Sequence, residues 1–225
     1  VVSGLCKACS ENNCALLGGE TAELPGLYPP GEYDLVGTIV GAVDKKKIIT
    51  GSTIMPGDVL IGLPSSGLHT NGYSLARKVI FETAKLKITD KLPGTVRTVA
   101  DALLAVHRSY LKPVEKVMEK VQIRGMAHIT GGGFQDNIPR VLPGNVNAVI
   151  DRRKWKVPAL FQFIQKTGKV HKDEMYRVFN MGIGYILIVR KQDEGRTISI
   201  LGRTEFTPVV IGYIEKGNKK VRFSD

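Results

Sequence analysis

The pattern of apolar and polar positions changes near residue 55. From there on, short runs typical of strands alternate with segments of helical period. We expect strands over 59–63, 126–130, 146–150, 184–190 and 208–215, with a further edge strand over 220–223. We expect helices over 73–83, 98–121 (kinked or split by Pro113), 134–142, 158–166 and 173–179, and one more between the last two long strands. This order predicts an α/β (α+β) fold with helices covering a mixed sheet.

The first part of the chain has a different pattern. Apolar residues at positions 2, 5, 6 and 9 predict a helix within 1–14, and 34–43 and 48–50 are strand-like. The turn at 55–58 is the best domain boundary, so we predict an N-terminal domain over 1–54 and a C-terminal domain over 55–225. Because the chain opens at Val1 inside a helical pattern, we expect a piece of a longer protein.

Composition narrows the class of protein. The 43% hydrophobic and 24% charged residues exclude disorder, and no apolar run approaches the ~18 residues of a membrane-spanning helix. The net charge of +11 comes from scattered basic residues without interleaved aromatics, so neither nucleic acid nor membrane is an expected partner. Cys6, Cys9 and Cys14 lack a second ligand pair for a metal knuckle. An odd cysteine count without a secretory signal predicts a reducing, cytoplasmic compartment.

Three glycine-rich turns interrupt the pattern with residues suited to phosphate chemistry. In the first, Gly18-Gly19 precedes Glu20 and Glu23. Carboxylate oxygens are ligands that Mg²⁺ prefers, so these two are candidate metal ligands. The alternative is a turn whose glutamates only face water.

The second turn, 64–74, lies between an expected strand and an expected helix. Its small hydroxyls and glycines expose backbone N–H groups at a helix N-terminus, which suits a phosphate. The candidate phosphate-binding residues are Ser65, Ser66, Gly67, Thr70 and Asn71, and His69 is a candidate for proton transfer. The alternative is a plain capped turn.

The third turn, 128–140, again leads from a strand through glycines into a helix. Three consecutive glycines cost conformational entropy, and close approach to a ligand would explain them. The candidate binding residues are Thr130, Gly131, Gly132, Gly133 and Asn137, with His128 as a second catalytic candidate. A fourth, weaker loop at 180–184 is expected to be structural. Together the turns and the charge indicate an enzyme acting on phosphorylated small molecules.

The motifs G-G-E-T-A-E-L-P-G (18–26), L-P-S-S-G-L-H-T-N-G-Y-S-L (63–75), M-A-H-I-T-G-G-G-F-Q-D-N-I-P-R (126–140) and F-N-M-G-I-G (179–184) occur in one order along the chain. In that order they resemble the phosphoribosylformylglycinamidine cyclo-ligase family, also called aminoimidazole ribonucleotide synthetases. The resemblance covers essentially the whole chain. One glycine-rich loop alone would be shared with related families such as thiamine-monophosphate kinase and selenophosphate synthetase.

The resemblance implies the end of a barrel-forming, ATP-binding and dimerising N-terminal domain, followed by a complete C-terminal α/β domain. The family's D-G-V-G-T-K-like segment would lie upstream of Val1, so we expect the chain alone to be inactive. Asp136 stands where the family usually has Glu. The carboxylate is kept but reaches less far, so we do not expect Asp136 to be essential.

The activity that the resemblance implies is ATP-dependent ring closure of formylglycinamidine ribonucleotide to aminoimidazole ribonucleotide through an imidoyl phosphate. ATP and Mg²⁺ would be the cofactors, the nucleotide the substrate, and a homodimer the full-length assembly. Two alternatives stay open. One is a sibling ATP-dependent phosphoryl-transfer enzyme of the same superfamily, and the other is a non-catalytic nucleotide-binding module.

Overall fold

The computed structural model describes residues 1–225 and divides into two compact units, Val1–Ile48 and Ile49–Asp225. The N-terminal unit contains one α-helix, α1 (Val2–Glu11), as its apolar period predicts, and one 3₁₀ turn (Lys45–Lys47). No residue of α1 is buried. The expected strands over 34–43 and 48–50 do not form, so these two predictions were wrong. A strand requires a partner for its backbone groups, and no segment of the chain pairs with either run.

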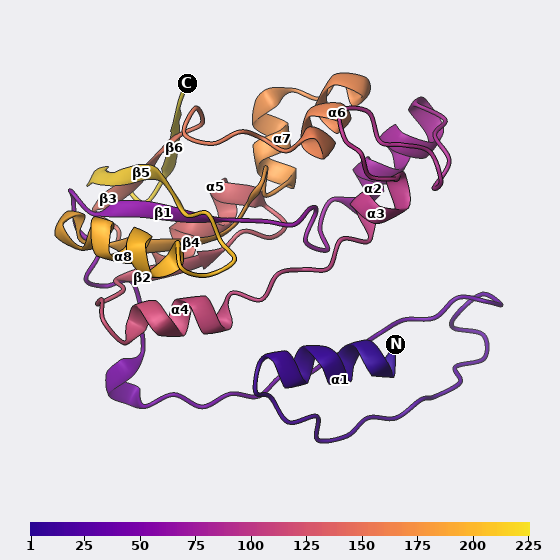
Figure 1. Cartoon of the computed structure of the whole chain (residues 1–225), viewed down its shortest axis with the longest axis horizontal. Coiled ribbons are helices and arrows are strands. Elements are labelled where there is room, and N and C mark those ends of the chain that lie inside the picture. Colours follow the sequence, from indigo (N-terminus) through magenta and orange to yellow (C-terminus); the bar gives the residue numbers. More distant parts are fainter. The chain divides into compact units, whose positions relative to one another are not determined.

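The C-terminal unit is built on one six-stranded sheet of order β2-β4-β1-β5-β3-β6 (Figure 1). All neighbouring strands are antiparallel except β3 and β6, which are parallel. The sheet is therefore mixed, and each expected strand of this unit is confirmed to within about two residues. The strands are β1 (Val59–Pro64), β2 (Gly125–His128), β3 (Val146–Asp151), β4 (Ile183–Val189), β5 (Val209–Lys216) and β6 (Val221–Ser224).

Helices cover both faces of this sheet, which confirms the predicted fold class. Figure 1 shows α5, α6 and α7 on one side of the strands and α4 and α8 on the other. None of the helices combines the length and apolar character needed to cross a lipid bilayer. The helices are α2 (Tyr73–Arg77), continued by a π-helical stretch (Lys78–Thr83), α3 (Val99–Leu103), α4 (Leu111–Met118), α5 (Gly133–Asn137), continued by a 3₁₀ turn (Ile138–Val141), α6 (Ala159–Gly168), α7 (Lys172–Val178), and α8 (Glu194–Leu201), preceded by a 3₁₀ turn (Lys191–Asp193).

Strand β1 shows how the sheet separates two hydrophobic cores. Leu60 packs in the larger core beneath α2, α3, α5, α6 and α7, whereas Val59, Ile61 and Leu63 pack in the smaller core with α4 and α8. Successive side chains of a strand point to opposite faces, so a continuous apolar run suits a strand covered on both sides. The centre of the sheet is therefore a rigid base for the loops at the strand ends.

The expected long helix over 98–121 is the main error within the C-terminal unit. The chain leaves the helical conformation after α3 and forms it again only at α4, so 104–110 is an irregular linker. Pro113 is the third residue of α4 and is tolerated there, because the first helical turn has no partner for a backbone N–H. This linker carries residues that matter below.

Candidate functional site

The loop between β1 and α2 has a tightly constrained backbone. His69 and Thr70 adopt positive φ angles of 52° and 62°, and Gly72 follows at 75°. Positive φ is uncommon for residues other than glycine, and such strain persists only where the surroundings impose it. The amide N–H groups of residues 67–71 donate no hydrogen bond within the protein. The loop thus combines a strained backbone with free donors at the end of a rigid strand.

Asn180 holds this loop in place from the other side of the site. Its amide nitrogen donates to the carbonyl oxygens of Gly67 (2.8 Å) and Leu68 (3.3 Å). Its amide oxygen accepts from the Ser65 hydroxyl (2.8 Å) and from the Gly182 backbone N–H (2.9 Å). Asn180 is only 2% exposed, so these contacts are sheltered from water. The loop at 180–184, expected to be structural, is the support of the candidate site.

His69 is buried, and both of its ring nitrogens are in unusual positions. Nε2 lies 3.0 Å from the Ser66 amide nitrogen and 2.9 Å from the Ser66 hydroxyl, which itself donates to the Val106 carbonyl. The amide donates to Nε2 in one tautomer, and the hydroxyl oxygen accepts from Nε2–H in the other. Nδ1 is buried and has no hydrogen-bond partner. Ser66 therefore serves either tautomer of His69.

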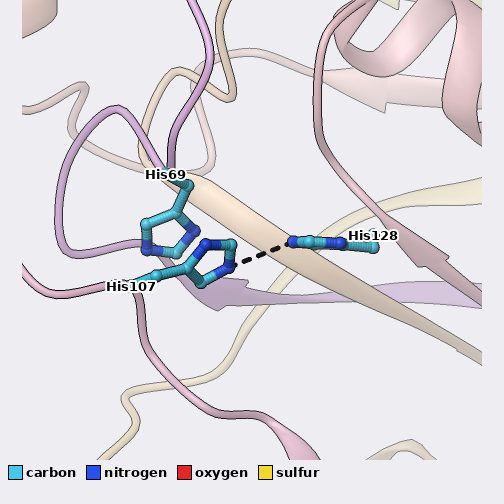
Figure 2. Close-up of side chains that lie close together, drawn as sticks. All are labelled: His69, His107 and His128. Atoms are coloured by element: carbon cyan, nitrogen blue, oxygen red, sulfur yellow. Dashed lines mark hydrogen bonds between the residues drawn. The ribbon is translucent and has the colours of Figure 1, made fainter. Parts of the chain in front are cut away.

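Three histidines from separate segments meet here (Figure 2). His69 comes from the loop after β1, His107 from the linker between α3 and α4, and His128 from the end of β2. The His69 and His107 rings are stacked with centroids 3.9 Å apart, and Nε2 of His107 lies 3.2 Å from Nε2 of His128. One ring nitrogen from each residue lies within 4.8 Å of the other two. We refer to His69, His107 and His128 as the histidine cluster.

The environment of the histidine cluster disfavours positive charge. The pKa of His69 is lowered to about 3, mainly by burial and to a smaller extent by the neighbouring His107, His128 and Arg108. Burial also lowers the pKa of His107 and of His128. Burial disfavours the charged form of an imidazole, and so does any positive neighbour. The three rings are therefore neutral near pH 7.

A cavity of about 300 Å³ adjoins the histidine cluster. Tyr110 stacks on Tyr185 and on Phe206 with centroid distances of 5.1 Å, and its hydroxyl donates to the Pro64 carbonyl. The Arg108 guanidinium lies over the Phe206 ring at 5.3 Å. The cavity thus has an aromatic wall, one cation and two neutral imidazoles. Its lining residues are His107, Arg108, Ser109, Tyr110, Leu111, Val114, His128 and Tyr185.

The glycine turn after β2 lies beside the first loop. A Cβ on Gly131 would lie 3.1 Å from the Asn71 side-chain oxygen. Asn137 fixes the turn by donating to the carbonyls of Gly131 (3.2 Å) and Gly133 (2.7 Å). Gly133 has a positive φ, and a Cβ there would overlap the Tyr176 carbonyl oxygen. Packing against α7 is therefore sufficient to require glycine at 133.

The structure brings most of the predicted site residues together within the C-terminal unit, and the other two, Glu20 and Glu23, belong to the N-terminal unit. Residues 65–71, His128 and 130–137 are connected by the contacts above. Glu20 and Glu23 lie exposed in the N-terminal unit, where no histidine, cysteine or third carboxylate gathers with them as a possible ligand set. Cys6, Cys9 and Cys14 are free thiols.

Sequence reasoning missed His107, Tyr110 and Asn180. The apolar pattern placed His107 and Tyr110 in a continuous helix, which hid them as candidates. Asn180 could have been found from the sequence, because it lies in the fourth glycine-containing motif. Gly184 in that motif lies against His69 and Tyr110, where a Cβ would overlap the Tyr110 hydroxyl.

The sequence pattern of the family described as "AIR synthase related protein, C-terminal domain" matches residues 55–224. Three relatives named phosphoribosylformylglycinamidine cyclo-ligase are similar to almost the whole chain. The relative from Thermodesulfovibrio yellowstonii is 47% identical over 97% of this chain and 64% of its own length. Those from Cupriavidus pinatubonensis (54%) and Alkaliphilus oremlandii (44%) cover 88% and 98% of this chain and 56% and 65% of their own lengths. These findings confirm the resemblance predicted from the motifs, and the chain spans about 56–65% of these relatives.

Solved structures share the fold at low sequence identity. Thiamine-monophosphate kinase from Stenotrophomonas maltophilia has a TM-score of 0.54 and 12% identity over 81% of this chain and 54% of its own. The hydrogenase maturation protein HypE in complex with ATP has a TM-score of 0.53 and 15% identity over 77% of this chain and 49% of its own. At these identities the likeness concerns the fold alone.

Proposed function

The chain belongs to the family of AIR synthase related proteins, and from this premise we propose that it is part of an ATP-dependent phosphoribosylformylglycinamidine cyclo-ligase, a ligase of purine biosynthesis. The activity is proposed for the longer protein, in which this chain contributes the C-terminal domain and the end of the N-terminal domain. The observation that carries the proposal is the similarity to named cyclo-ligases over almost the whole chain. Three of the four motifs are in contact in the structure, because Asn180 binds the loop after β1, the Ile129 amide donates to the Gly184 carbonyl, and Gly131 lies against Asn71.

The proposed reaction forms a C–N bond after activating an amide oxygen. The amide oxygen of formylglycinamidine ribonucleotide attacks the γ-phosphate of ATP, releasing ADP and forming an imidoyl phosphate. The amidine nitrogen then attacks the activated carbon, and inorganic phosphate leaves. Without this activation the leaving group would be oxide or hydroxide, which is poor. Such phosphoryl transfer depends mainly on positioning and on compensating negative charge.

The loop after β1 is suited to hold a phosphate. The free amides of residues 67–71 are donors at the start of α2, and backbone N–H groups in such turns favour anions. The hydroxyls of Ser65, Ser66 and Thr70 donate to protein oxygens and turn toward a ligand only by giving up those bonds. In the proposal the amides therefore contribute most of the phosphate binding, while Ser65, Ser66, Gly67, Thr70 and Asn71 shape the loop.

The two proposed catalytic histidines have different tasks. His128 is exposed at the end of β2, so its neutral imidazole can accept or return a proton of the reacting amidine. His69 is buried, with Nδ1 free of partners, and stabilises charge that develops beside it. Thr130, Gly131, Gly132, Gly133 and Asn137 form the opposite wall for the nucleotide substrate.

Mg²⁺ is the metal expected for this chemistry, and Glu20 and Glu23 are the proposed ligands. Their carboxylates suit the ion, but two exposed groups without a third ligand do not form a complete site within this chain. We therefore assign no step to the metal. A homodimer and a cytoplasmic location complete the proposal, because these follow from the family resemblance and from the unpaired cysteines.

The proposal is tested with the parent protein, extended upstream of Val1. The protein is incubated with ATP, Mg²⁺ and formylglycinamidine ribonucleotide, and ADP and aminoimidazole ribonucleotide are followed together. Equal formation of both products, dependent on the substrate, is the expected result. ADP without aminoimidazole would instead favour a sibling phosphoryl-transfer enzyme. ATP binding without either product from folded protein would favour a non-catalytic nucleotide-binding module.

A further inference from the structure

The histidine cluster has the composition of a transition-metal site rather than of a proton relay alone. Neutral imidazoles suit Zn²⁺ and similar borderline ions, whereas Mg²⁺ and Ca²⁺ prefer oxygen ligands. His69, His107 and His128 present three nitrogens within 4.8 Å of one another, and this is the one group of three or more histidine, cysteine or carboxylate ligands in the structure. We propose that His69, His107 and His128 bind one divalent transition-metal ion of the Zn²⁺ class.

The spacing of two of the nitrogens fits this ion. Zn–N bonds of 2.0–2.1 Å in a tetrahedral site place neighbouring nitrogens about 3.3 Å apart. The Nε2 atoms of His107 and His128 are 3.2 Å apart. A ring nitrogen of His69 lies within 4.8 Å of the other two, and the stacked His69 and His107 rings must turn relative to each other before both lone pairs point at one ion. His107 lies in the irregular linker between α3 and α4, so it can adjust without breaking a helix or a strand.

Nδ1 is the atom of His69 that would bind the ion. It is buried without any partner in a residue that is 2% exposed, and Figure 2 shows the His69 ring lying against the His107 ring. Leaving a buried polar atom without a hydrogen bond is costly, so such an atom calls for a partner that the protein itself does not provide. A metal ion is such a partner for a bare ring nitrogen.

Ser66 supplies the second contact that ligating histidines usually have. A histidine that binds metal through one nitrogen carries its proton on the other and donates it to a nearby acceptor, which fixes the ring. Nε2 of His69 lies 2.9 Å from the Ser66 hydroxyl, which in turn donates to the Val106 carbonyl at 2.6 Å. The tautomer that leaves Nδ1 free therefore has an acceptor in the Ser66 hydroxyl, and the Ser66 backbone N–H gives up its bond to Nε2 when this tautomer forms.

The fourth coordination position faces the cavity. His107 and His128 both line it, and Arg108 supplies a cation on the same wall. Three protein ligands with one open position are typical of zinc sites that bind a water molecule or a substrate. The open position would take water or an oxygen atom of an anionic ligand. This inference goes beyond the proposed function and changes the roles given there to His69 and His128, because a nitrogen that binds the ion does not accept a proton. Metal binding is measured without substrate or turnover, so the two proposals are tested separately.

The test is a calorimetric titration of the metal-free 225-residue chain with Zn²⁺. Cys6, Cys9 and Cys14 are first replaced by serine, because thiolates also bind Zn²⁺. In this background we expect one ion per chain. At about 100 times the dissociation constant, Zn²⁺ should raise the Tm of the Ile49–Asp225 unit by about 5–10 °C. A chain that binds no Zn²⁺ would overturn the proposal.

Single variants identify the ligands. His107→Ala and His128→Ala remove side chains that are not deeply buried, so both should fold, as circular dichroism of the metal-free proteins will check. Each should weaken Zn²⁺ binding at least about tenfold, the lower end of the effect of losing even an outer contact. His171→Ala is the matched control, because this fourth histidine precedes α7, its side chain is 79% exposed, and it lies outside the cluster. Unchanged affinity in both cluster variants, or an equal loss in the control, would overturn the assignment.

The spectrum of bound Co²⁺ gives an independent readout of the ligands. Co²⁺ in the cysteine-free background should show the absorption of a nitrogen-ligated tetrahedral ion, and His107→Ala should reduce it. A spectrum that is the same in His107→Ala and in its parent would contradict ligation by the cluster.

Discussion

The two units of this protein contain similar apolar runs, but only the run in the C-terminal unit forms a buried strand. Ile61 in β1 is fully buried between β4 and β5, with helices on both faces of the sheet. Ile39, in the strand-like run of the N-terminal unit, is 84% exposed and pairs with nothing. The residue type and local pattern are alike, and only the presence of neighbouring strands differs. An apolar, strand-like run forms a strand only where a neighbouring strand pairs with its backbone. Whether such a neighbour is present depends on the rest of the fold.

The comparison is tested most strongly by making one substitution in both units. Ile61→Ala should lower the free energy of unfolding by about 2–5 kcal/mol, because it leaves a cavity between packed side chains. Ile39→Ala should change it by less than about 0.5 kcal/mol, as expected for an exposed site. Urea denaturation followed by circular dichroism measures both. Equal losses would show that the N-terminal run is packed as tightly as β1.

The ion pairs of the two units differ in the same way. Arg124 donates to Asp58 at 2.8 Å with side chains only 13% and 4% exposed. Lys7 and Glu11 on α1 are 4.0 Å apart and mostly exposed. Arg124→Met should lower the free energy of unfolding by about 3 kcal/mol, because it leaves the buried Asp58 carboxylate without its ion-pair partner. Lys7→Met should lower it by less than about 0.5 kcal/mol. The same denaturation experiment separates them, and a cost below 1 kcal/mol for Arg124→Met would mean that Asp58 remains hydrated.

The third comparison concerns turnover of the parent cyclo-ligase and rests on the proposed function. His69→Ala should lower turnover about 10²-fold or more while the fold survives, within the range of general acid–base and charge-stabilising groups. Glu20→Gln, in the N-terminal unit, should instead raise the Mg²⁺ concentration required for half-maximal activity. Steady-state assays over a Mg²⁺ series measure both effects. Near-normal turnover of His69→Ala would remove it from the catalytic residues, and an unchanged Mg²⁺ titration would do the same for Glu20 as a ligand.

The smallest expected effects come from glycines. Gly133→Ala places a methyl group against the Tyr176 carbonyl at a positive φ. It should therefore lower the free energy of unfolding by about 1–3 kcal/mol. Gly41→Ala in the N-terminal unit meets no atom within 4 Å and should be neutral or slightly stabilising. Thermal unfolding of both variants distinguishes a glycine required by packing from one in open space. A neutral Gly133→Ala would show that the turn is able to shift away from α7.

The sequence predicted the structure correctly where short-range patterns of apolar, glycine and proline residues determine it. The strands of the C-terminal unit were predicted to within about two residues, because apolar runs bounded by glycine and proline have few other structures. The four motifs likewise indicated the family and most of the residues that gather at the site. The helix over 98–121 was wrong because helical propensity continues through a segment that tertiary contacts hold in an irregular conformation. Because His107 and Tyr110 lie in this segment, they were not recognised as candidate site residues.

The sequence by itself determined the mixed α/β class, the glycine turns and the chemical types available to the site, since these depend on local pattern and composition. Only the tertiary structure decided that Asn180 supports the loop after β1 and that three histidines from separate segments lie close together. It also decided that strand-like runs near the N-terminus remain unpaired in this chain. The physical reason is the same in each case. Burial, stacking and strand pairing depend on neighbours that are distant in sequence, and no local pattern specifies them.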